Sequence, residues 1–393
     1  MKDRKRIFVY MEDAPVHCDV IAHGLHHAAP PILRSASDYI DGIAIYPAGK
    51  RFAQDDLDRE LAPLCFTLSL IPTLICKALS RYPVLDLGIP SLLPPRLMSR
   101  VVRQSRADIL FTFVGADFST LKRADRLATL TGKSSVFYIV DDFLAAMQIR
   151  GTRSADLARA RGMTCEVLGR AKHVFTITKG LGQQLRESCG ITPTTLNLAF
   201  EAAPRPAPPL KKQIIYLGSI NFLYEGGLHD LFKVVDGVRR ATGEDLKVRL
   251  TVPPALAVNQ LGELPPFVTS APVETSHALR EEIASSLFAF LPYSFESREK
   301  AMVSTSFPSK SMQYFASARS ILVYGPDYGV ATKLFQEMNL PSVVFSYDEL
   351  QEAVLAHLQA SPDHSLVYRN YLATEHSRAA IRTTLCRDLA LEP

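Results

Sequence analysis

Hydroxyl and lysine side chains gather between a predicted strand and a predicted helix in the second half of the chain. The apolar run at 287–291 predicts a buried parallel strand, and Pro308 marks a helix start. Thr305, Ser309 and Lys310 stand at that start. Ligands bind at the carboxyl ends of parallel strands, and the free N–H groups of a helix start attract phosphate. The stretch therefore predicts a phosphate site with Lys310 as its cation.

A glycine turn supplies a second predicted phosphate contact. Residues 213–220, QIIYLGSI, predict a strand that runs into Gly218 and Ser219. Glycine after a strand lets the backbone approach a diphosphate closely. The Pro-rich segment 201–212 precedes this strand and predicts an extended connector, so we expect a second domain to begin at residue 213.

Strands alternate with helices in the first half as well. The segments 108–117 and 133–143 predict strands of a parallel sheet, whose apolar residues are followed by Asp117 and by Asp141 with Asp142. These carboxylates should emerge at the edge of the sheet. Asp141 or Asp142 either caps the next helix or contacts a ligand, and the sequence leaves both readings open.

A polar loop follows the first predicted strand, residues 6–11. It contains His17 and ends near Gly24, and we expect it to face a bound ligand at the carboxyl edge of the sheet. Its histidine and acidic residues do not have an established zinc spacing. The D-x-D at 56–58 lies in a charged segment typical of a solvated helix start. No metal site is expected.

The run at 307–316, FPSKSMQYFA, resembles the "P-S-K-x-x-E-Y-x-A" signature of retaining, family-four-type glycosyltransferases of the B-type fold. Residues 320–323 resemble the "P-V-L" strand that follows it in that family. The resemblance implies an α/β fold of two Rossmann-like domains that face a central cleft. The expected parts are an acceptor-side domain at 1–200, a linker at 201–212, a nucleotide-sugar domain at 213–365 and a C-terminal helix at 366–393 that braces the first domain.

The resemblance also implies an activity. The protein would move a sugar from a nucleotide-sugar donor to a saccharide or lipid-linked acceptor with retention, in cell-surface glycan or exopolysaccharide synthesis, with no cofactor besides the donor. Lys310 and Glu296 are the implied catalytic residues. The implied donor-binding residues are Gly218, Ser219, Thr305, Ser309, Lys310 and Gln313, and the implied acceptor-side residues are His17, Gly24, Asp117, Asp141 and Asp142.

The chain departs from the family pattern in two places. Gln313 replaces the usual glutamate, and 221–227 lacks the basic pair that neutralises the donor phosphates. Lys310, Arg298 or Lys300 would then supply the positive charge. These departures favour the alternative that the protein is a catalytically inactive, glycosyltransferase-like binding protein or scaffold. A sugar-nucleotide epimerase of the same fold is a third alternative.

Composition narrows the protein class. The 393 residues are 47% hydrophobic and suffice for two or three domains with sizeable cores. The net charge of +4 is small and interspersed, which argues against a dedicated nucleic-acid partner. The apolar segment 61–76 is shorter than a membrane span and contains prolines, so it predicts either a buried helical hairpin or a peripheral membrane contact.

Six scattered cysteines without a C-x-x-C pair, in a sequence that does not open with a secretory signal pattern, predict reduced thiols. The expected location is the cytoplasm or the inner face of the membrane.

Overall fold

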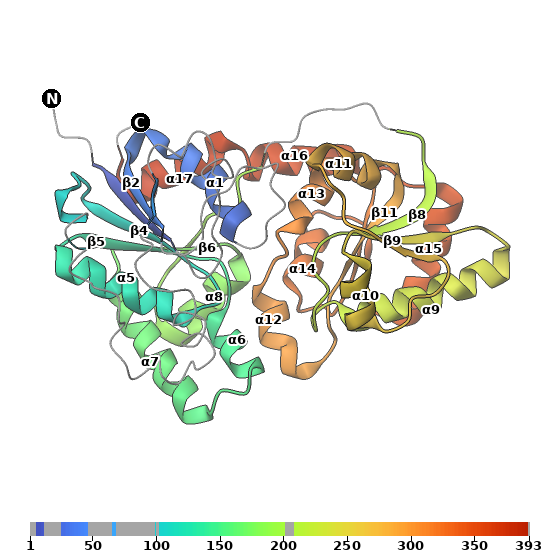
Figure 1. Cartoon of the computed structure of the whole chain (residues 1–393), viewed down its shortest axis with the longest axis horizontal. Coiled ribbons are helices and arrows are strands. Elements are labelled where there is room, and N and C mark those ends of the chain that lie inside the picture. Colours follow the sequence, from blue (N-terminus) through green and yellow to red (C-terminus); the bar gives the residue numbers. More distant parts are fainter. Residues whose placement is uncertain are drawn as a thin grey trace. The chain divides into compact units, whose positions relative to one another are not determined.

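A computed structural model of the chain describes residues 5–11, 25–45, 65–67, 99, 102–200 and 208–391. It divides into two compact units (Figure 1). Unit 1 comprises Met1–Ala199 and His376–Pro393, and unit 2 comprises Phe200–Glu375. The predicted segments around His17, Gly24 and 56–58, most of 61–76 and most of the linker lie outside the described residues.

Unit 1 contains a parallel sheet in the order β3-β2-β1-β4-β5-β6-β7. Its strands are β1 (Ile7–Met11), β2 (Ile40–Ile45), β3 (Cys65–Thr67), β4 (Ile109–Val114), β5 (Ser134–Ile139), β6 (His173–Thr176) and β7 (Thr194–Thr195). Its helices include α1 (Leu25–Ser35), the 3-10 turn η1 (Ser37–Tyr39), α5 (Phe118–Thr131), α6 (Phe143–Ile149), α7 (Ser154–Arg170), α8 (Lys179–Cys189) and α17 (Arg378–Leu389).

Unit 2 repeats this arrangement with the order β10-β9-β8-β11-β12-β13. Its strands are β8 (Lys211–Tyr216), β9 (Lys247–Leu250), β10 (Val268–Ser270), β11 (Ser286–Pro292), β12 (Ile321–Tyr324) and β13 (Val343–Val344). Its helices are α9 (Glu225–Thr242), α10 (Pro254–Leu261), α11 (Ser276–Ser285), the 3-10 turn η4 (Ser297–Glu299), α12 (Lys300–Thr305), α13 (Lys310–Ser317), α14 (Val330–Glu337), α15 (Tyr347–Ala360) and α16 (Ser365–Glu375).

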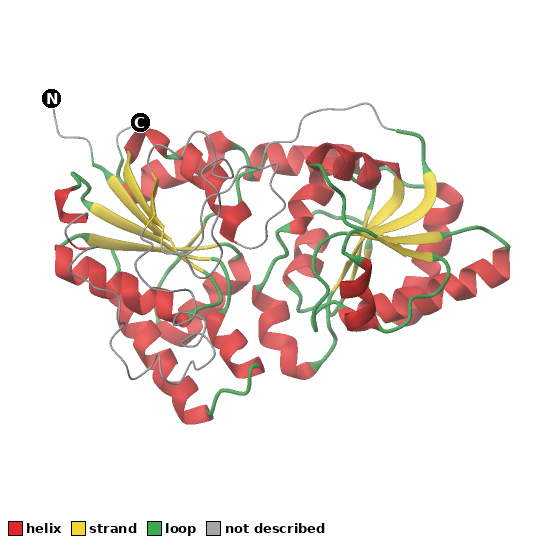
Figure 2. Cartoon of the chain, viewed as in Figure 1, coloured by secondary structure: helices red, strands yellow, loops and turns green. Residues whose placement is uncertain are grey.

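Both sheets follow the doubly wound order, in which the chain starts at a central strand, builds one side and then returns to build the other. Helices lie against both faces of each sheet (Figure 2). The central strands are therefore apolar on consecutive residues, and β4 and β11 are buried along their whole length. The predicted α/β class with two Rossmann-like domains is confirmed.

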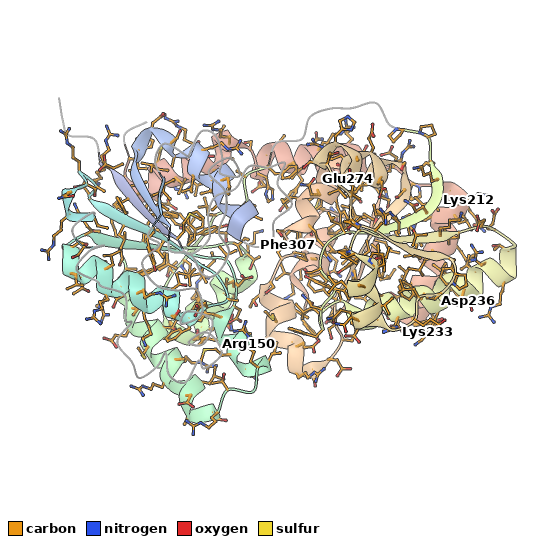
Figure 3. All side chains as sticks on the ribbon, viewed as in Figure 1. Arg150, Lys212, Lys233, Asp236, Glu274 and Phe307 are labelled. Atoms are coloured by element: carbon orange, nitrogen blue, oxygen red, sulfur yellow. A yellow bond between two sulfur atoms is a disulfide. The ribbon has the colours of Figure 1, made fainter. Side chains whose placement is uncertain are left out.

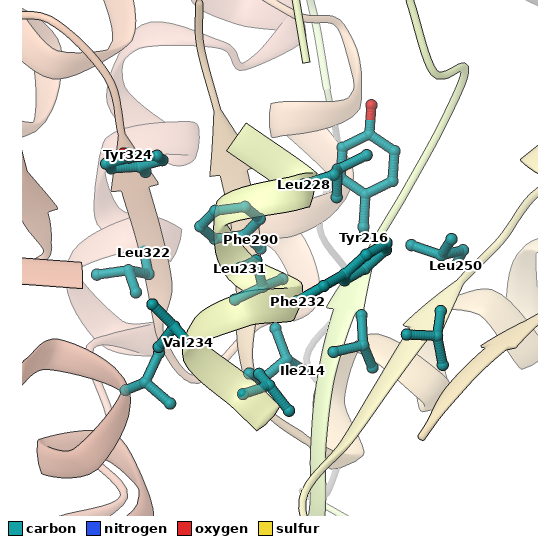
Figure 4. Packing of buried hydrophobic residues seen from close by; sticks show 14 of the residues in the cluster. Ile214, Tyr216, Leu228, Leu231, Phe232, Val234, Leu250, Phe290, Leu322 and Tyr324 are labelled. Carbon is teal, nitrogen blue, oxygen red and sulfur yellow. The ribbon is translucent and has the colours of Figure 1, made fainter. Parts of the chain in front are cut away.

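Helix α9 shows how the core of unit 2 is assembled. Its inner side carries Leu228 and Leu231, which belong to one buried cluster with Ile214 of β8 and Phe290 of β11 (Figure 4). Lys233 lies on the outer side of the helix, where its side chain is mostly exposed (Figure 3). This division into an apolar and a charged side is what a helix on an open sheet requires.

The C-terminal helix differs from the prediction. Instead of the one helix predicted at 366–393 there are two, α16 in unit 2 and α17 in unit 1, and the chain passes between the units at His376. The buried His376 imidazole donates from Nδ1 to the Leu198 carbonyl at 2.6 Å. Helix α17 contacts the region of α1 through an ion pair of Arg382 with Asp38 at 2.8 Å.

Cys165 and Cys189 form a disulfide that joins α7 to α8, so the prediction of reduced thiols is wrong for this pair. Cys386 is a free thiol. Among the described residues, no helix combines the length and the apolar character that crossing a bilayer would need.

Candidate phosphate site

The strand order of unit 2 reverses between β8 and β11, and ligands of doubly wound sheets bind where such a reversal occurs. The turn after β8 contains Gly218 with φ of +92°, a conformation that strains any residue with a Cβ. The Tyr216 hydroxyl donates to the Ser219 carbonyl at 2.7 Å and closes this turn. The predicted glycine turn therefore lies at the reversal point of the sheet.

Lys310, at the first turn of α13, reaches into this turn. Its Nζ lies 3.9 Å from the ring centroid of Tyr216 and 3.7 Å from that of Tyr224, the residue that precedes α9. A Cβ placed on Gly218 would lie 3.4 Å from Cδ of Lys310, so the glycine leaves room for the lysine stem. The two ring faces attract a cation, but they carry no negative charge that would neutralise it.

The Lys310 ammonium is buried, and in the part of the chain that the structure describes it has no hydrogen-bond or ion-pair partner. Burial lowers the pKa of Lys310 well below its usual value. A desolvated cation without an anion is costly, and a ligand phosphate at this position would remove that cost. The arrangement therefore suits an anionic ligand.

Tyr314 ties α13 to the two strands that flank the reversal point. Its hydroxyl accepts from the Leu217 amide at 2.6 Å and donates to the Phe290 carbonyl at 3.3 Å. Helix α9 is held equally closely, because a Cβ on Gly227 would lie only 2.5 Å from Cβ of Pro292. Hydrogen bonds and close packing therefore hold the elements that position Lys310.

The polar residues predicted to bind the donor differ from one another in exposure and hydrogen bonding. Ser309 is exposed and its side chain does not cap the helix. The Thr305 hydroxyl donates back to the Ala301 carbonyl at 2.8 Å, and Ser219 is exposed. Oε1 of Gln313 is buried and makes no hydrogen bond within the described structure, so it can accept from a ligand hydroxyl or amide.

The loop after β11 contains two glutamates, of which one is exposed and the other is buried. Glu296 is exposed, and its backbone amide donates to Oγ of Ser294 at 3.0 Å. Glu299 is buried, with Oε1 accepting from Nε of Arg298 at 3.1 Å and Oε2 unpaired among the described residues. Lys300 lies 4.9 Å from the ring centroid of Tyr328. Of the three candidate cations, Lys310 is thus the buried one without an acidic neighbour.

The sequence did not indicate which aromatic rings surround Lys310. Tyr216 and Tyr224 look like ordinary strand and turn residues, and Glu299 has no sequence signal that separates it from Glu296. Tyr216 ends a strand that the glycine turn marks, which is the one local feature that could have suggested its position.

In unit 1 the three predicted carboxylates are used differently. Asp117 caps α5, since Oδ1 accepts from the Ser119 amide at 2.8 Å. Asp142 caps α6, since Oδ1 accepts from the Ala145 amide at 2.9 Å. The capping alternative therefore holds for Asp142. Burial and the neighbouring charge of Asp142 raise the pKa of Asp141 to about 6.

Comparison with known proteins identifies the fold of this chain, and only solved structures contribute to it. No family profile and no curated protein matches the sequence. Among solved structures, an alpha-glucosyltransferase in complex with UDP and a 13-mer DNA matches with a TM-score of 0.60 and 11% identity, covering 98% of this chain and 99% of that chain. The alpha,alpha-trehalose 6-phosphate synthase of Burkholderia multivorans matches with a TM-score of 0.58 and 10% identity, covering 98% and 96%.

This is the B-type glycosyltransferase fold. A putative UDP-N-acetylglucosamine 2-epimerase from Listeria monocytogenes also matches, with a TM-score of 0.54 and 12% identity over 99% of this chain and 98% of that chain. Because the fold is shared by proteins named as transferases and as an epimerase, it does not choose between these activities.

Within its B-type fold, this chain places a buried lysine, Lys310, at the reversal point of the second sheet. Among the described residues, no group of three His, Cys, Asp or Glu side chains is placed to hold a metal ion. Lys310, the Gly218 turn and the start of α13 lie together in unit 2.

Proposed function

We propose that this protein is a glycosyltransferase that moves a sugar from a nucleoside diphosphate sugar to a hydroxyl group of a saccharide or lipid-linked acceptor. The observation that carries the proposal is the buried, unpaired ammonium of Lys310 beside the Gly218 turn. The fold supports it, because the matching structures include one with bound UDP. The "P-S-K" signature at the start of α13 supports it independently.

Lys310 has the central role in this mechanism. As the bond between the sugar and the diphosphate breaks, negative charge grows on the leaving phosphate, and a nearby fixed cation stabilises that charge. In the dehydrated setting between Tyr216 and Tyr224, this stabilisation is stronger than in water. Oε1 of Gln313 would bind the nucleotide ribose, which is the role of the glutamate that it replaces.

The finer parts of the proposal come from the signature. They are retention of the sugar configuration, a role in cell-surface glycan or exopolysaccharide synthesis and independence from cofactors. Proton NMR of the first product tests retention, because the coupling constant of the anomeric proton distinguishes the two configurations of most hexoses.

A panel of nucleoside diphosphates tests the donor site. A ligand at one hundred times its dissociation constant should stabilise the protein by about 2.7 kcal/mol, which is visible as a rise in melting temperature. The matching nucleotide sugar should then be hydrolysed slowly without an acceptor and transferred faster with one. Binding without hydrolysis would indicate the inactive binding protein, and interconversion of two donor sugars would indicate an epimerase.

A further inference from the structure

The amine of Lys310 is surrounded by phenol rings in the described part of unit 2. Its Nζ lies over the rings of Tyr216 and Tyr224 and makes no hydrogen bond or ion pair with the described residues. The other titratable groups of this cluster are also tyrosines. Tyr314 acts on the Tyr216 phenol, and the ring centroid of Tyr293 lies 6.2 Å from that of Tyr224. The cluster therefore attracts a cation but cannot neutralise one.

Burial acts against the positive charge of this amine. It lowers the pKa of Lys310 well below its usual value, and no charged group in the described part of the chain contributes to that shift. The phenols stay uncharged, because burial raises the pKa of Tyr216, Tyr293 and Tyr314. The attraction of two ring faces for a cation opposes the shift, but it is smaller than the loss of water around a fully buried ammonium. The amine therefore loses its proton at a lower pH than an ordinary lysine does.

We propose that Lys310 takes up a proton when a nucleoside diphosphate binds beside the Gly218 turn, an inference that rests on the proposed phosphate site. In this step the lone pair of Nζ accepts a proton from the solvent, and the resulting ammonium pairs with a phosphate oxygen. No other bond forms or breaks. The diphosphate supplies the negative charge that the tyrosine cluster lacks, so the bound ligand favours the protonated lysine. Nucleotide binding and protonation of Lys310 are thus linked, and each strengthens the other.

Contact between the amine and a phosphate requires one side chain to move. Nζ of Lys310 is buried, although the residue as a whole is partly exposed. Tyr216 is fully buried in the core cluster of unit 2 and cannot give way (Figure 4). Tyr224 is partly exposed in the turn before α9. The amine therefore meets the phosphate when the Lys310 side chain rotates outward or when the Tyr224 ring moves aside, and all of these groups belong to unit 2.

Calorimetric titration of the full-length protein with UDP measures the proton uptake. The binding heat is compared in two buffers of different ionisation enthalpy, from pH 7 to pH 9, because a proton taken from the buffer adds the heat of its ionisation. A terminal phosphate titrates near about pH 6, so UDP itself contributes little in this range. The wild type should take up about one proton per bound UDP at pH 9, whereas a lysine with an ordinary pKa of about 10.4 would take up almost none. The dissociation constant should rise by up to about tenfold per pH unit over the range of full uptake.

Three variants assign the proton to Lys310. Lys310→Arg keeps a charge that cannot be lost in this pH range, so UDP should bind without proton uptake. Lys310→Met has no group to protonate and should bind more weakly, also without uptake. Lys233→Met, whose side chain is mostly exposed on α9, should match the wild type.

The outcomes separate this inference from the function on which it rests. A wild type that binds UDP without taking up a proton at pH 9 would overturn the inference and leave the phosphate site in place. Equal proton uptake in the wild type and in Lys310→Met would assign the proton to another group and overturn it as well. A wild type that binds none of the nucleoside diphosphates in the panel would overturn the proposed function, and this inference with it.

Discussion

Replacing Lys310 with methionine should weaken nucleotide binding and stabilise the free protein at the same time. Methionine fills the space between Tyr216 and Tyr224 without a charge. The lost hydrogen bond to a charged phosphate is worth about 1.5–3 kcal/mol, so the dissociation constant of UDP should rise about 10- to 150-fold.

The expected change in stability has the opposite sign. Exchanging buried ionic groups for apolar ones often stabilises a protein by about 1–4 kcal/mol. The lost attraction between the ammonium and the two rings offsets about 0.5–2 kcal/mol of this. We therefore expect a net gain of about 1 kcal/mol, which corresponds to a rise of about 2–4 °C in melting temperature for a unit of this size.

Calorimetric titration with UDP and thermal melting without ligand measure the two effects. Lys233→Met is the matched control, because that side chain is mostly exposed on the outer side of α9. Both quantities should stay at wild-type values in the control. A Lys310→Met protein that melts earlier and binds UDP as tightly as the wild type would show that Lys310 has a structural role, and the proposed phosphate site would be wrong.

Three further predictions follow from the described contacts. Gly227→Ala should lower the free energy of unfolding, measured by urea titration, by about 1–3 kcal/mol, because its Cβ would collide with Pro292. Gly226→Ala is the control. Its Cβ would enter open space, so the free energy of unfolding should rise by about 0.5–1 kcal/mol. Burial lowers the pKa of His376 to about 4, so the unfolded chain binds its proton first as the pH falls. Stability should therefore decrease by about 2 kcal/mol between pH 7 and pH 5, and His376→Asn should remove that part of the decrease in urea titrations at the two pH values. Sugar transfer should survive exhaustive chelation, because the proposed site neutralises phosphate through Lys310, and recovery of a lost activity by magnesium or manganese would contradict this assignment.

The α/β class and the position of the glycine turn follow from local sequence. Runs such as 287–291 are apolar on consecutive residues because helices cover both faces of the sheet, and that pattern is visible without any tertiary information. Gly218 is recognisable because it follows such a run directly. The start of α13 at Lys310 is likewise a local feature, set by the preceding proline and serine.

Tertiary structure decided which side chains act on one another. Tyr216 and Tyr224 enclose Lys310 only because β8, α9 and α13 meet where the strand order reverses, and no local pattern encodes that meeting. Asp141 and Asp142 are neighbours in sequence, yet the exact start of α6 makes the Asp142 side chain a cap, while the Asp141 carbonyl accepts from the Phe143 amide at 3.0 Å. Periodicity and turn chemistry act over a few residues, whereas burial, charge and pairing depend on segments that are distant in the chain. The sequence alone therefore indicates most of the strands and the turns that follow them, whereas the break between α16 and α17 and the contacts of the site depend on the packed structure.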